Sequence, residues 1–431
     1  MRVISSEAVE QRTIHILEQL LGQASDQVGV RLWDGVLWPD DRLRRATLVL
    51  QHPAALSQMF SAGSEVGLAE AYLRNDFDIE GDIAAAFEVS DVLLGRLRNW
   101  KQKLKMAALL LRAPKTPKIG RARRMLLNRR GRKHSLERDR EAVMFHYDLS
   151  NDFYHLWLDR RMVYSCAYFH SPSNNLDDAQ EQKLDYLCRK LRLRPGQGLL
   201  DIGCGWGAFV VYAAKHFGVH AVGTTLSKRQ ADWARARVAE SGLDSIATIR
   251  VCDYRNLATE PDHYDAIVSI GMAEHVGREQ LSNYFAIARR LLKPGGVFMN
   301  QAIGEGIIPR PGNRASDSFI ERYVFPEGDI PPLSILLRAA ESSGFEIRDV
   351  ENLREHYGLT LEHWLRRLEA QHSAALAFVN EETYRVWRLY LAGSAHGFRR
   401  GHIAVYQTLL TKLDDRGRTA LPLTRSDWYW N

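Results

Sequence analysis

Three glycines at alternate positions follow an apolar run near the middle of the chain, where residues 199–207 read LLDIGCGWG. Glycine lets the backbone pass close to a ligand and adopt positive φ. The spacing differs from the Gly-x-Gly-x-x-Gly of dinucleotide sites, and residues 223–227 (GTTLS) offer no acid that could bind a ribose. The loop, with Asp201, Gly203 and Gly205, therefore predicts a site for a small nucleoside, and S-adenosylmethionine (SAM) is the candidate. A turn that only packs a strand on a helix is the alternative.

A carboxylate, Glu274, lies three residues beyond the apolar run Tyr264–Gly271. If that run is a strand, Glu274 stands at the carboxyl edge of the sheet, where open α/β sheets bind ligands. A catalytic carboxylate is one interpretation. An acid that merely stabilises the start of a helix is the other.

The elements that must position these groups alternate between strand and helix, which indicates an α/β domain with a largely parallel sheet. Period-two and apolar runs predict strands at 198–203, 220–225, 247–252, 264–271, 296–301 and 346–353, and a last edge strand over 403–409. Helices are expected at 206–216, 228–239 and 279–292, the last of them ended by the turn Lys293–Gly296. The segment 304–344 is expected to be a lid or a substrate-facing insertion.

Residues 1–95 predict a small mixed domain without a catalytic motif. Helical spacing occurs over 8–21, 53–60 and 67–73, a strand-like run over 46–51, and the acidic stretch 76–82 is expected to be a turn. The next segment, 96–136, holds fifteen Lys or Arg and no acid, interleaved with apolar residues. This composition suits an anionic membrane surface. A solvated linker and a nucleic-acid contact are the alternatives.

The composition places the chain among ordinary globular proteins, with 45% hydrophobic and 26% charged residues. The sequence has no apolar run long enough to span a bilayer and no apolar signal segment at its start. Its four cysteines are widely spaced and form no Cys-x-x-Cys pair. The cysteine pattern predicts a protein of the reducing cytoplasm, and the basic segment predicts peripheral association with the inner face of the membrane.

Five motifs in order resemble those of the cyclopropane-fatty-acid synthase family, whose members are SAM-dependent methyltransferases acting on unsaturated acyl chains. They are HYDLSNDFY at 146–154, YSCAYF at 164–169, the glycine loop at 200–207, TLSKRQ at 225–230 and EHVG at 274–277. The resemblance covers residues 140–412. It implies a Rossmann-like class I methyltransferase fold with a mainly parallel seven-stranded sheet. The domains expected are a lipid or accessory domain at 1–95, a basic linker with membrane contact at 96–136, and a catalytic domain at 137–431.

The resemblance implies that methyl transfer to a cis double bond of a membrane phospholipid gives a carbocation, which becomes a cyclopropane when the new methyl group loses a proton. It also implies a bicarbonate base held by Cys166, Glu274, the backbone near Ile303, and Tyr357. The family has a histidine where this chain has Gln301, which can donate N–H but cannot take up a proton near neutral pH. Ala273 also replaces an aromatic residue. Both departures favour a methyl- or methylene-branched product as the alternative.

The same resemblance assigns the cofactor contacts. Tyr147 would face the sulfonium, and Asp253 and Tyr254 would border the adenine. The remaining expected contacts are Tyr164, Ser165, Thr225, Leu226 and Gln230. The expected partners are unsaturated phospholipid and an anionic membrane, together with a second copy in a homodimer, and nucleic acid is not expected. Two other functions are weighed: a binding protein without turnover, against which Glu274 and Cys166 argue, and an RNA methyltransferase, whose Asn/Asp-Pro-Pro-aromatic motif is missing from 268–274.

Overall fold

The computed structural model describes residues 6–22, 26–60, 64–96, 108, 149–259, 261–309, 318–326, 328–419 and 421–429. The chain forms two compact units, each made of several segments. Unit 1 comprises Met1–Leu126, Pro309–Val324 and Asn380–His396, and unit 2 comprises Leu127–Ile308, Phe325–Val379 and Gly397–Asn431. The basic segment, apart from its first residue and Ala108, and Tyr147 lie outside the described residues. The predicted boundaries at 95 and 136 therefore stay predictions.

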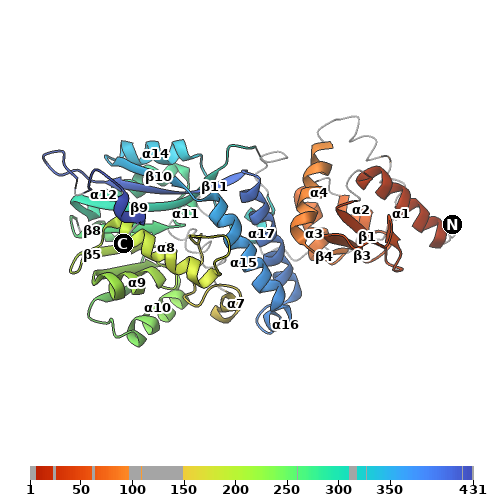
Figure 1. Cartoon of the computed structure of the whole chain (residues 1–431), viewed down its shortest axis with the longest axis horizontal. Helices are drawn as coiled ribbons and strands as arrows, with labels where there is room; N and C mark the ends of the chain where they lie inside the picture. The colour runs from red at the N-terminus through yellow and green to blue at the C-terminus, as the bar shows by residue number, and fades with distance from the viewer. Residues whose placement is uncertain are drawn as a thin grey trace. The chain divides into compact units, whose positions relative to one another are not determined.

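Unit 1 has a four-stranded sheet in the order β2-β1-β3-β4, drawn in red and orange in Figure 1. Its strands are β1 (Val28–Arg31), β2 (Leu37–Trp38), β3 (Ala46–Leu50) and β4 (Phe77–Gly81). Its helices are α1 (Ser6–Leu21), α2 (Ala55–Phe60), α3 (Glu65–Leu73), α4 (Ile83–Arg96), α13 (Phe319–Tyr323) and most of α17 (Glu381–Arg399). The prediction of a turn over 76–82 was wrong. Phe77 and Ile79 are buried at alternate positions, so the stretch pairs antiparallel with β3 as β4.

Helix α17 belongs to unit 1 through two buried arginines. Arg385 donates hydrogen bonds to the Tyr72 carbonyl at 2.8 Å and to Asn75 Oδ1 at 2.7 Å. Arg388 donates to the Tyr72 hydroxyl at 2.9 Å and to the Ile79 carbonyl at 3.0 Å. Guanidinium groups are buried in proteins when their donors find acceptors, as the Nη groups of both arginines do, while Nε of Arg385 lies 3.5 Å from Glu381 Oε1. Residues more than 300 positions apart in the sequence thus make one core.

Unit 2 is built on a seven-stranded sheet in the order β10-β11-β9-β8-β5-β6-β7. The strands are β5 (Gly198–Ile202), β6 (His220–Thr225), β7 (Ala247–Val251), β8 (Tyr264–Ile270), β9 (Leu292–Glu305), β10 (Glu346–Asn352) and β11 (Ile403–Thr411). The pairs from β7 to β9 are parallel. The seven-stranded, mainly parallel α/β sheet predicted from the sequence is therefore confirmed. The expectation of a last edge strand was wrong, because β11 pairs antiparallel with both β9 and β10.

Helices cover both faces of this sheet (Figure 1). Helices α8 (Leu176–Leu191), α9 (Ala208–Phe217) and α10 (Lys228–Glu240) bury one apolar cluster, and α12 (Leu281–Leu291) and α14 (Leu333–Ser342) bury another on the opposite face. The expected insertion 304–344 thus contributes α14 to the core. The remaining elements of unit 2 are α7 (Asn151–His155), η1 (Tyr254–Thr259), α11 (Ala273–Val276), η2 (Arg278–Gln280), α15 (Arg354–Ala370), α16 (His372–Ala375) and α18 (Ser426–Tyr429).

Where predicted, strand and helix limits agree with the structure to within two residues, except at β9. That strand begins at Leu292, directly after α12, and continues to Glu305, so the Lys293–Gly296 turn is contained in its first residues. Within the described part of the chain, no helix is both long and apolar enough to cross a bilayer.

Candidate active site

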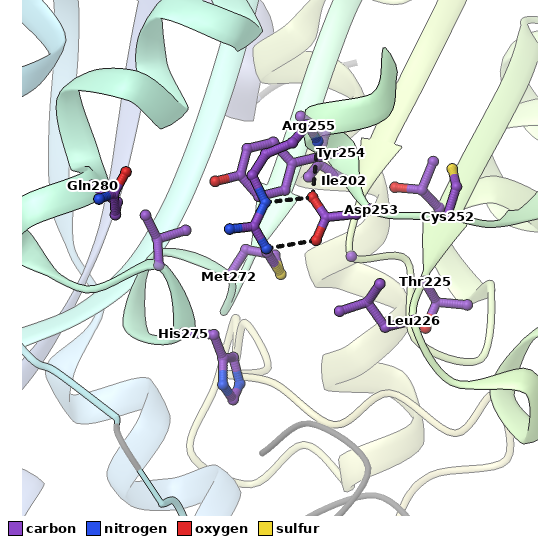
Figure 2. Close-up of a pocket in the computed structure, with 13 residues that line it drawn as sticks. Ile202, Thr225, Leu226, Cys252, Asp253, Tyr254, Arg255, Met272, His275 and Gln280 are labelled. Carbon is purple, nitrogen blue, oxygen red and sulfur yellow. Dashed lines mark hydrogen bonds and ion pairs between the residues drawn. The ribbon is translucent and has the colours of Figure 1, made fainter. Parts of the chain in front are cut away.

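A pocket opens at the carboxyl ends of β5, β6, β7 and β8, and Figure 2 shows its lining residues. It holds about 500 Å³ of space between atoms, including the part open to solvent. Five of its residues were predicted to bind the cofactor: Gly203, Thr225, Leu226, Asp253 and Tyr254. Eight were not: Ile202, Thr224, Cys252, Arg255, Met272, His275, Val276 and Gln280.

The glycine loop forms one wall of the pocket. Gly203, Gly205 and Gly207 have φ values of +83°, +53° and +79°, a conformation that disfavours side chains. A Cβ atom on Gly203 would come within 2.5 Å of Met272 Cγ. Close approach of bare backbone to the pocket is what an adenosyl ligand without a pyrophosphate requires, so the site fits SAM. Gly205 is not among the lining residues of the pocket as it stands.

Two side chains at the pocket hold each other in place. Arg255 donates to both carboxylate oxygens of Asp253, from Nε at 2.8 Å and from Nη2 at 2.6 Å (Figure 2). The backbone N–H of Arg255 donates to the same carboxylate at 2.9 Å. The Arg255 guanidinium also lies 5.6 Å from the ring centre of Tyr254. Asp253 is therefore fixed as an acceptor beside the ring expected to border the adenine.

Gln230 supports the pocket from behind. It is buried, and its Oε1 accepts a hydrogen bond of 2.8 Å from the Thr225 hydroxyl. Thr225 Oγ1 in turn accepts from the backbone N–H of Ser227 at 3.2 Å. These bonds fix Thr225, which does line the pocket. Gln230 was predicted as a direct contact, but the structure places it one residue behind the lining.

A buried lysine, Lys183, lies beneath the predicted cofactor residues Ser165 and Asp201. Its ammonium donates a 3.0 Å hydrogen bond to Ser165 Oγ. Burial lowers the pKa of Lys183 to about 8, against the opposing influence of Cys166, Asp159 and Asp201. Burial likewise raises the pKa of Asp201 to about 7, and the charge of Lys183 acts in the opposite direction. Lys183 is thus a buried amine that contacts Ser165 and lies outside the lining of the pocket.

The spacing of Lys183 in the sequence indicates burial, although lysine is usually exposed. Lys183 is seven residues from Leu176 and four from Leu187, which places it on the buried stripe of α8. Tyr164, another predicted contact, packs its ring 5.2 Å from that of Trp364 in an aromatic cluster. Neither Tyr164, Ser165 nor Asp201 lines the pocket itself.

Glu274 reaches across from α11 to the neighbouring strand. Its Oε1 accepts a 2.8 Å hydrogen bond from the backbone N–H of Ile303 on β9. The second oxygen, Oε2, is buried and has no partner among the described residues. Burial raises the pKa of Glu274 to about 7, opposed by the Ile303 N–H. An orphaned acid oxygen with this pKa can hold or give up a proton near neutral pH.

Cys166 and Tyr357 meet at the backbone of Leu353. Cys166 is fully buried, and its thiol donates to the Ala167 carbonyl at 3.2 Å and weakly to the Leu353 carbonyl at 3.8 Å. Burial raises the pKa of Cys166, so the group is a neutral donor and no nucleophile. The backbone N–H of Tyr357 donates to the same Leu353 carbonyl at 3.1 Å.

Strand pairing links these groups to Glu274. The Leu353 N–H donates to the carbonyl of Val405 on β11, which is the register partner of Ile303 on β9. The structure therefore brings Cys166, Tyr357, Ile303 and Glu274 to one end of three adjacent strands. Gln301 lies on the same strand as Ile303 and is 2% exposed. Its Oε1 accepts a 3.0 Å hydrogen bond from Gln407 on β11.

Comparison with known proteins agrees with this arrangement. The family model described as mycolic acid cyclopropane synthetase matches residues 134–408. A probable fatty acid methyltransferase of Pseudomonas putida is 39% identical over 401 residues, which are 93% of this chain and 95% of that protein. The cyclopropane-fatty-acyl-phospholipid synthase of Escherichia coli K12 is 38% identical over 272 residues, which are 63% of this chain and 68% of that protein.

A solved structure is similar as well. The mycolic acid cyclopropane synthase CmaA1, complexed with SAH and CTAB, has a TM-score of 0.59 and 36% identity, and the match covers 63% of this chain and 98% of that one. These similarities confirm the family and the class I methyltransferase fold predicted from the sequence motifs. The chain, with its glycine-loop pocket and its acid clamped to a neighbouring strand, belongs to the mycolic acid cyclopropane synthetase family.

Proposed function

We propose that this enzyme transfers a methyl group from SAM to the cis double bond of an unsaturated fatty acyl chain in membrane phospholipid and forms a cyclopropane fatty acid. The single observation that carries the proposal is the buried, half-satisfied carboxylate of Glu274, whose sequence neighbours Met272 and His275 line the pocket. A reaction that generates a proton from an apolar chain needs such a group in a site closed to water.

Methyl transfer from SAM is the reaction class of the protein. In this proposal, the pocket lined by Gly203, Thr225, Asp253 and Tyr254 is the cofactor site. When bound, SAM supplies an electrophilic methyl group on a sulfonium. Asp253, oriented by Arg255, and the bare backbone of the glycine loop fix the nucleoside end. Orientation of this kind is what a weak, uncharged nucleophile such as an alkene depends on.

Glu274, Cys166 and Gln301 would act on the proton that the substrate loses and on the charge of a bound oxyanion. The methyl group would pass from the sulfonium sulfur to one alkene carbon, which would leave S-adenosylhomocysteine as a neutral thioether and a carbocation on the other carbon, and ring closure would release a proton from the new methyl group. Glu274 accepts or relays that proton, because its raised pKa lies close to neutrality. Cys166, as a neutral donor, and Gln301, as an amide, suit a small oxyanion such as bicarbonate next to Glu274.

Phospholipid is the proposed substrate because the similar Escherichia coli enzyme is a cyclopropane-fatty-acyl-phospholipid synthase. The basic segment 96–136 would then bring the protein to the inner, anionic face of the membrane, where its substrate lies. A homodimer is part of the same proposal.

One observation favours a second product. Gln301 cannot take up a proton near neutral pH, so the proton acceptor closest to the new methyl group differs from that of a histidine-containing site. Loss of a proton from a chain carbon would then give a methyl- or methylene-branched chain. The similar Pseudomonas putida protein carries the broader name of probable fatty acid methyltransferase.

The test is to incubate the purified protein with SAM and vesicles of unsaturated phospholipid and to analyse the acyl chains by mass spectrometry after double-bond derivatisation. A product one methylene heavier that resists derivatisation is the expected cyclopropane. A product that still reacts supports the branched alternative. No mass increase in any unsaturated chain, with SAM binding intact, would refute methyl transfer to lipid.

A further inference from the structure

A row of buried polar side chains runs from helix α8 across the sheet and ends at Gln301. Lys190 on α8, Gln407 on β11 and Gln301 on β9 are 0%, 0% and 2% exposed. Lys190 Nζ donates to Gln407 Oε1 at 2.9 Å, and Gln407 Nε2 donates to Gln301 Oε1 at 3.0 Å. Buried polar groups of this kind persist where every member is satisfied, so the row fixes the orientation of each side chain.

The far end of the row is anchored by charge. Lys190 forms an ion pair with Glu351 on β10, and Glu351 also accepts a 2.9 Å hydrogen bond from the Tyr186 hydroxyl. The Lys190 ammonium lies 4.5 Å from the ring centre of Tyr186 and 5.2 Å from that of Trp428. The carboxylate and the two rings fix the position of the Lys190 ammonium, which can donate hydrogen bonds but cannot accept them.

The orientation of the two glutamine amides follows from Lys190, because this residue only donates hydrogen bonds. Lys190 offers N–H alone, so the oxygen of Gln407 must face it and the NH₂ of Gln407 must face away. That NH₂ requires an acceptor, so the oxygen of Gln301 must face Gln407. The NH₂ of Gln301 is therefore the only part of its amide that is left for another ligand.

Strand register places Gln301 near the backbone groups that hold the predicted catalytic residues. Glu351, Gln407 and Gln301 are direct partners across β10, β11 and β9. Two residues further along β9 is Ile303, whose backbone N–H holds Glu274, and two residues beyond Glu351 is Leu353, whose carbonyl receives Cys166. Two residues of a strand span about 7 Å, and their side chains share a face.

We propose that Gln407, held by Lys190, is a positioning residue that locks the Gln301 amide with its NH₂ toward Glu274 and Cys166, so that this site binds a small oxyanion through Gln301 without a titratable histidine. The inference rests on the proposed function and deepens it. It concerns which atom of Gln301 faces the anion, and it assigns that choice to residues outside the site.

The sharpest variant is Gln407→Glu. A carboxylate at 407 still accepts from Lys190 and keeps the size of the side chain, but it has no N–H for Gln301, so the Gln301 amide must turn and present its oxygen. In carbon-dioxide-free buffer, the bicarbonate concentration that gives half-maximal methyl transfer should rise about tenfold or more, the value of one lost charge-assisted bond. The affinity for S-adenosylhomocysteine should stay within about twofold of wild type.

A binding readout makes the test independent of the acyl substrate. Bicarbonate should raise the melting temperature of the wild-type protein saturated with S-adenosylhomocysteine, and should do so less for Gln407→Glu. The matched control is Thr408→Val, since Thr408 is equally buried on β11 and its hydroxyl has no partner among the described residues. That variant should behave as wild type in both measurements.

A second substitution tests the same orientation by rescue. Gln301→His in the Gln407→Glu background places an imidazole that, when protonated, donates from both nitrogens, so bicarbonate dependence should return toward wild type. Equal bicarbonate responses of wild type and Gln407→Glu would overturn the inference, whether or not lipid is methylated. Failure of wild type to methylate any unsaturated lipid, with the difference in bicarbonate stabilisation intact, would refute the proposed function alone.

Discussion

The ammonium of Lys183 donates a 3.0 Å hydrogen bond to the hydroxyl of Ser165, and the lysine is 1% exposed. Because the lysine supplies the proton of this bond, the Ser165 hydroxyl keeps its own proton for another acceptor. The pair therefore joins α8 to the segment that carries Cys166, at the side of the site where Asp201 is buried. The charge of Lys183 therefore acts on both Ser165, a predicted cofactor contact, and the buried Asp201.

Replacement of Lys183 by Met should weaken SAM binding about tenfold or more, because it removes a buried cation and leaves Ser165 and Asp201 without it. Isothermal titration with SAM measures the effect. Lys293→Met is the control, since Lys293 pairs with Asp265 and its side chain is 43% exposed. Equal losses in the two variants would show that Lys183 has no special part in cofactor binding.

Glu274→Gln should reduce methyl transfer about a hundredfold or more, since proton transfer by a placed side chain contributes at least that much. It should also stabilise the fold at high pH. The folded-state pKa of about 7 lies above the ordinary value of 4.5, so the wild-type protein loses stability as pH rises between these two values.

Melting temperatures measured from pH 4 to pH 8 check this sign, as expected from the two pKa values. The advantage of Glu274→Gln should be small near pH 4, grow through the interval and level off above the folded-state pKa. A difference that stays flat across the whole range would mean that the carboxylate is not buried as described.

Arg255→Met should raise the Kd for SAM about fivefold to tenfold and leave kcat at saturating SAM nearly unchanged. The reason is that Asp253 loses the two bonds that fix it, while the reacting end of the site is untouched. Arg237→Met is a fitting comparison, because Arg237 pairs with Glu240 on the exposed side of α10. A fall in kcat without a change in Kd would contradict this role.

The basic segment should dock the protein on anionic vesicles, with binding that weakens as salt increases. Reversal of charge at Arg121, Arg123 and Arg124 should weaken this binding about a hundredfold, at roughly 1 kcal/mol for each cation, and leave SAM affinity unchanged. Reversal of Lys228, Arg229 and Arg237, which are exposed on α10, serves as the control. If vesicle binding is unchanged by salt and by charge reversal at 121–124, the segment is only a linker.

The parts of the fold that the sequence predicts well are those decided by local pattern. The glycine loop and its strand were predicted correctly, because glycines favour positive φ and a consecutive apolar run favours a buried strand, and both are local features of the sequence. The burial of Lys183 and Lys190 is decided instead by what α8 packs against, and a lysine in an amphipathic helix normally faces water. Their positions on the apolar stripe, at spacings of three and four, were the available signal.

Sheet order and long-range pairing lie beyond such patterns. The alternation in 403–409 indicates a strand, but its place between β9 and β10 depends on the return of the chain, which alternation does not encode. Hydrogen bonds differ in the same way. The bond between Arg255 and Asp253 joins residues two apart in the sequence, so it can be predicted from local pattern. The bond between Gln407 and Gln301 joins residues 106 apart, so it cannot.

The arginines of α17 have a practical consequence for anyone who shortens this gene. A fragment that starts at residue 137 would keep Arg385 and Arg388 but discard Tyr72, Asn75 and Ile79, which receive their hydrogen bonds. Both guanidinium groups would then lose these acceptors and their ion pairs with Asp78, while Glu381 would remain beside Arg385, so such a truncated product should be less soluble on expression.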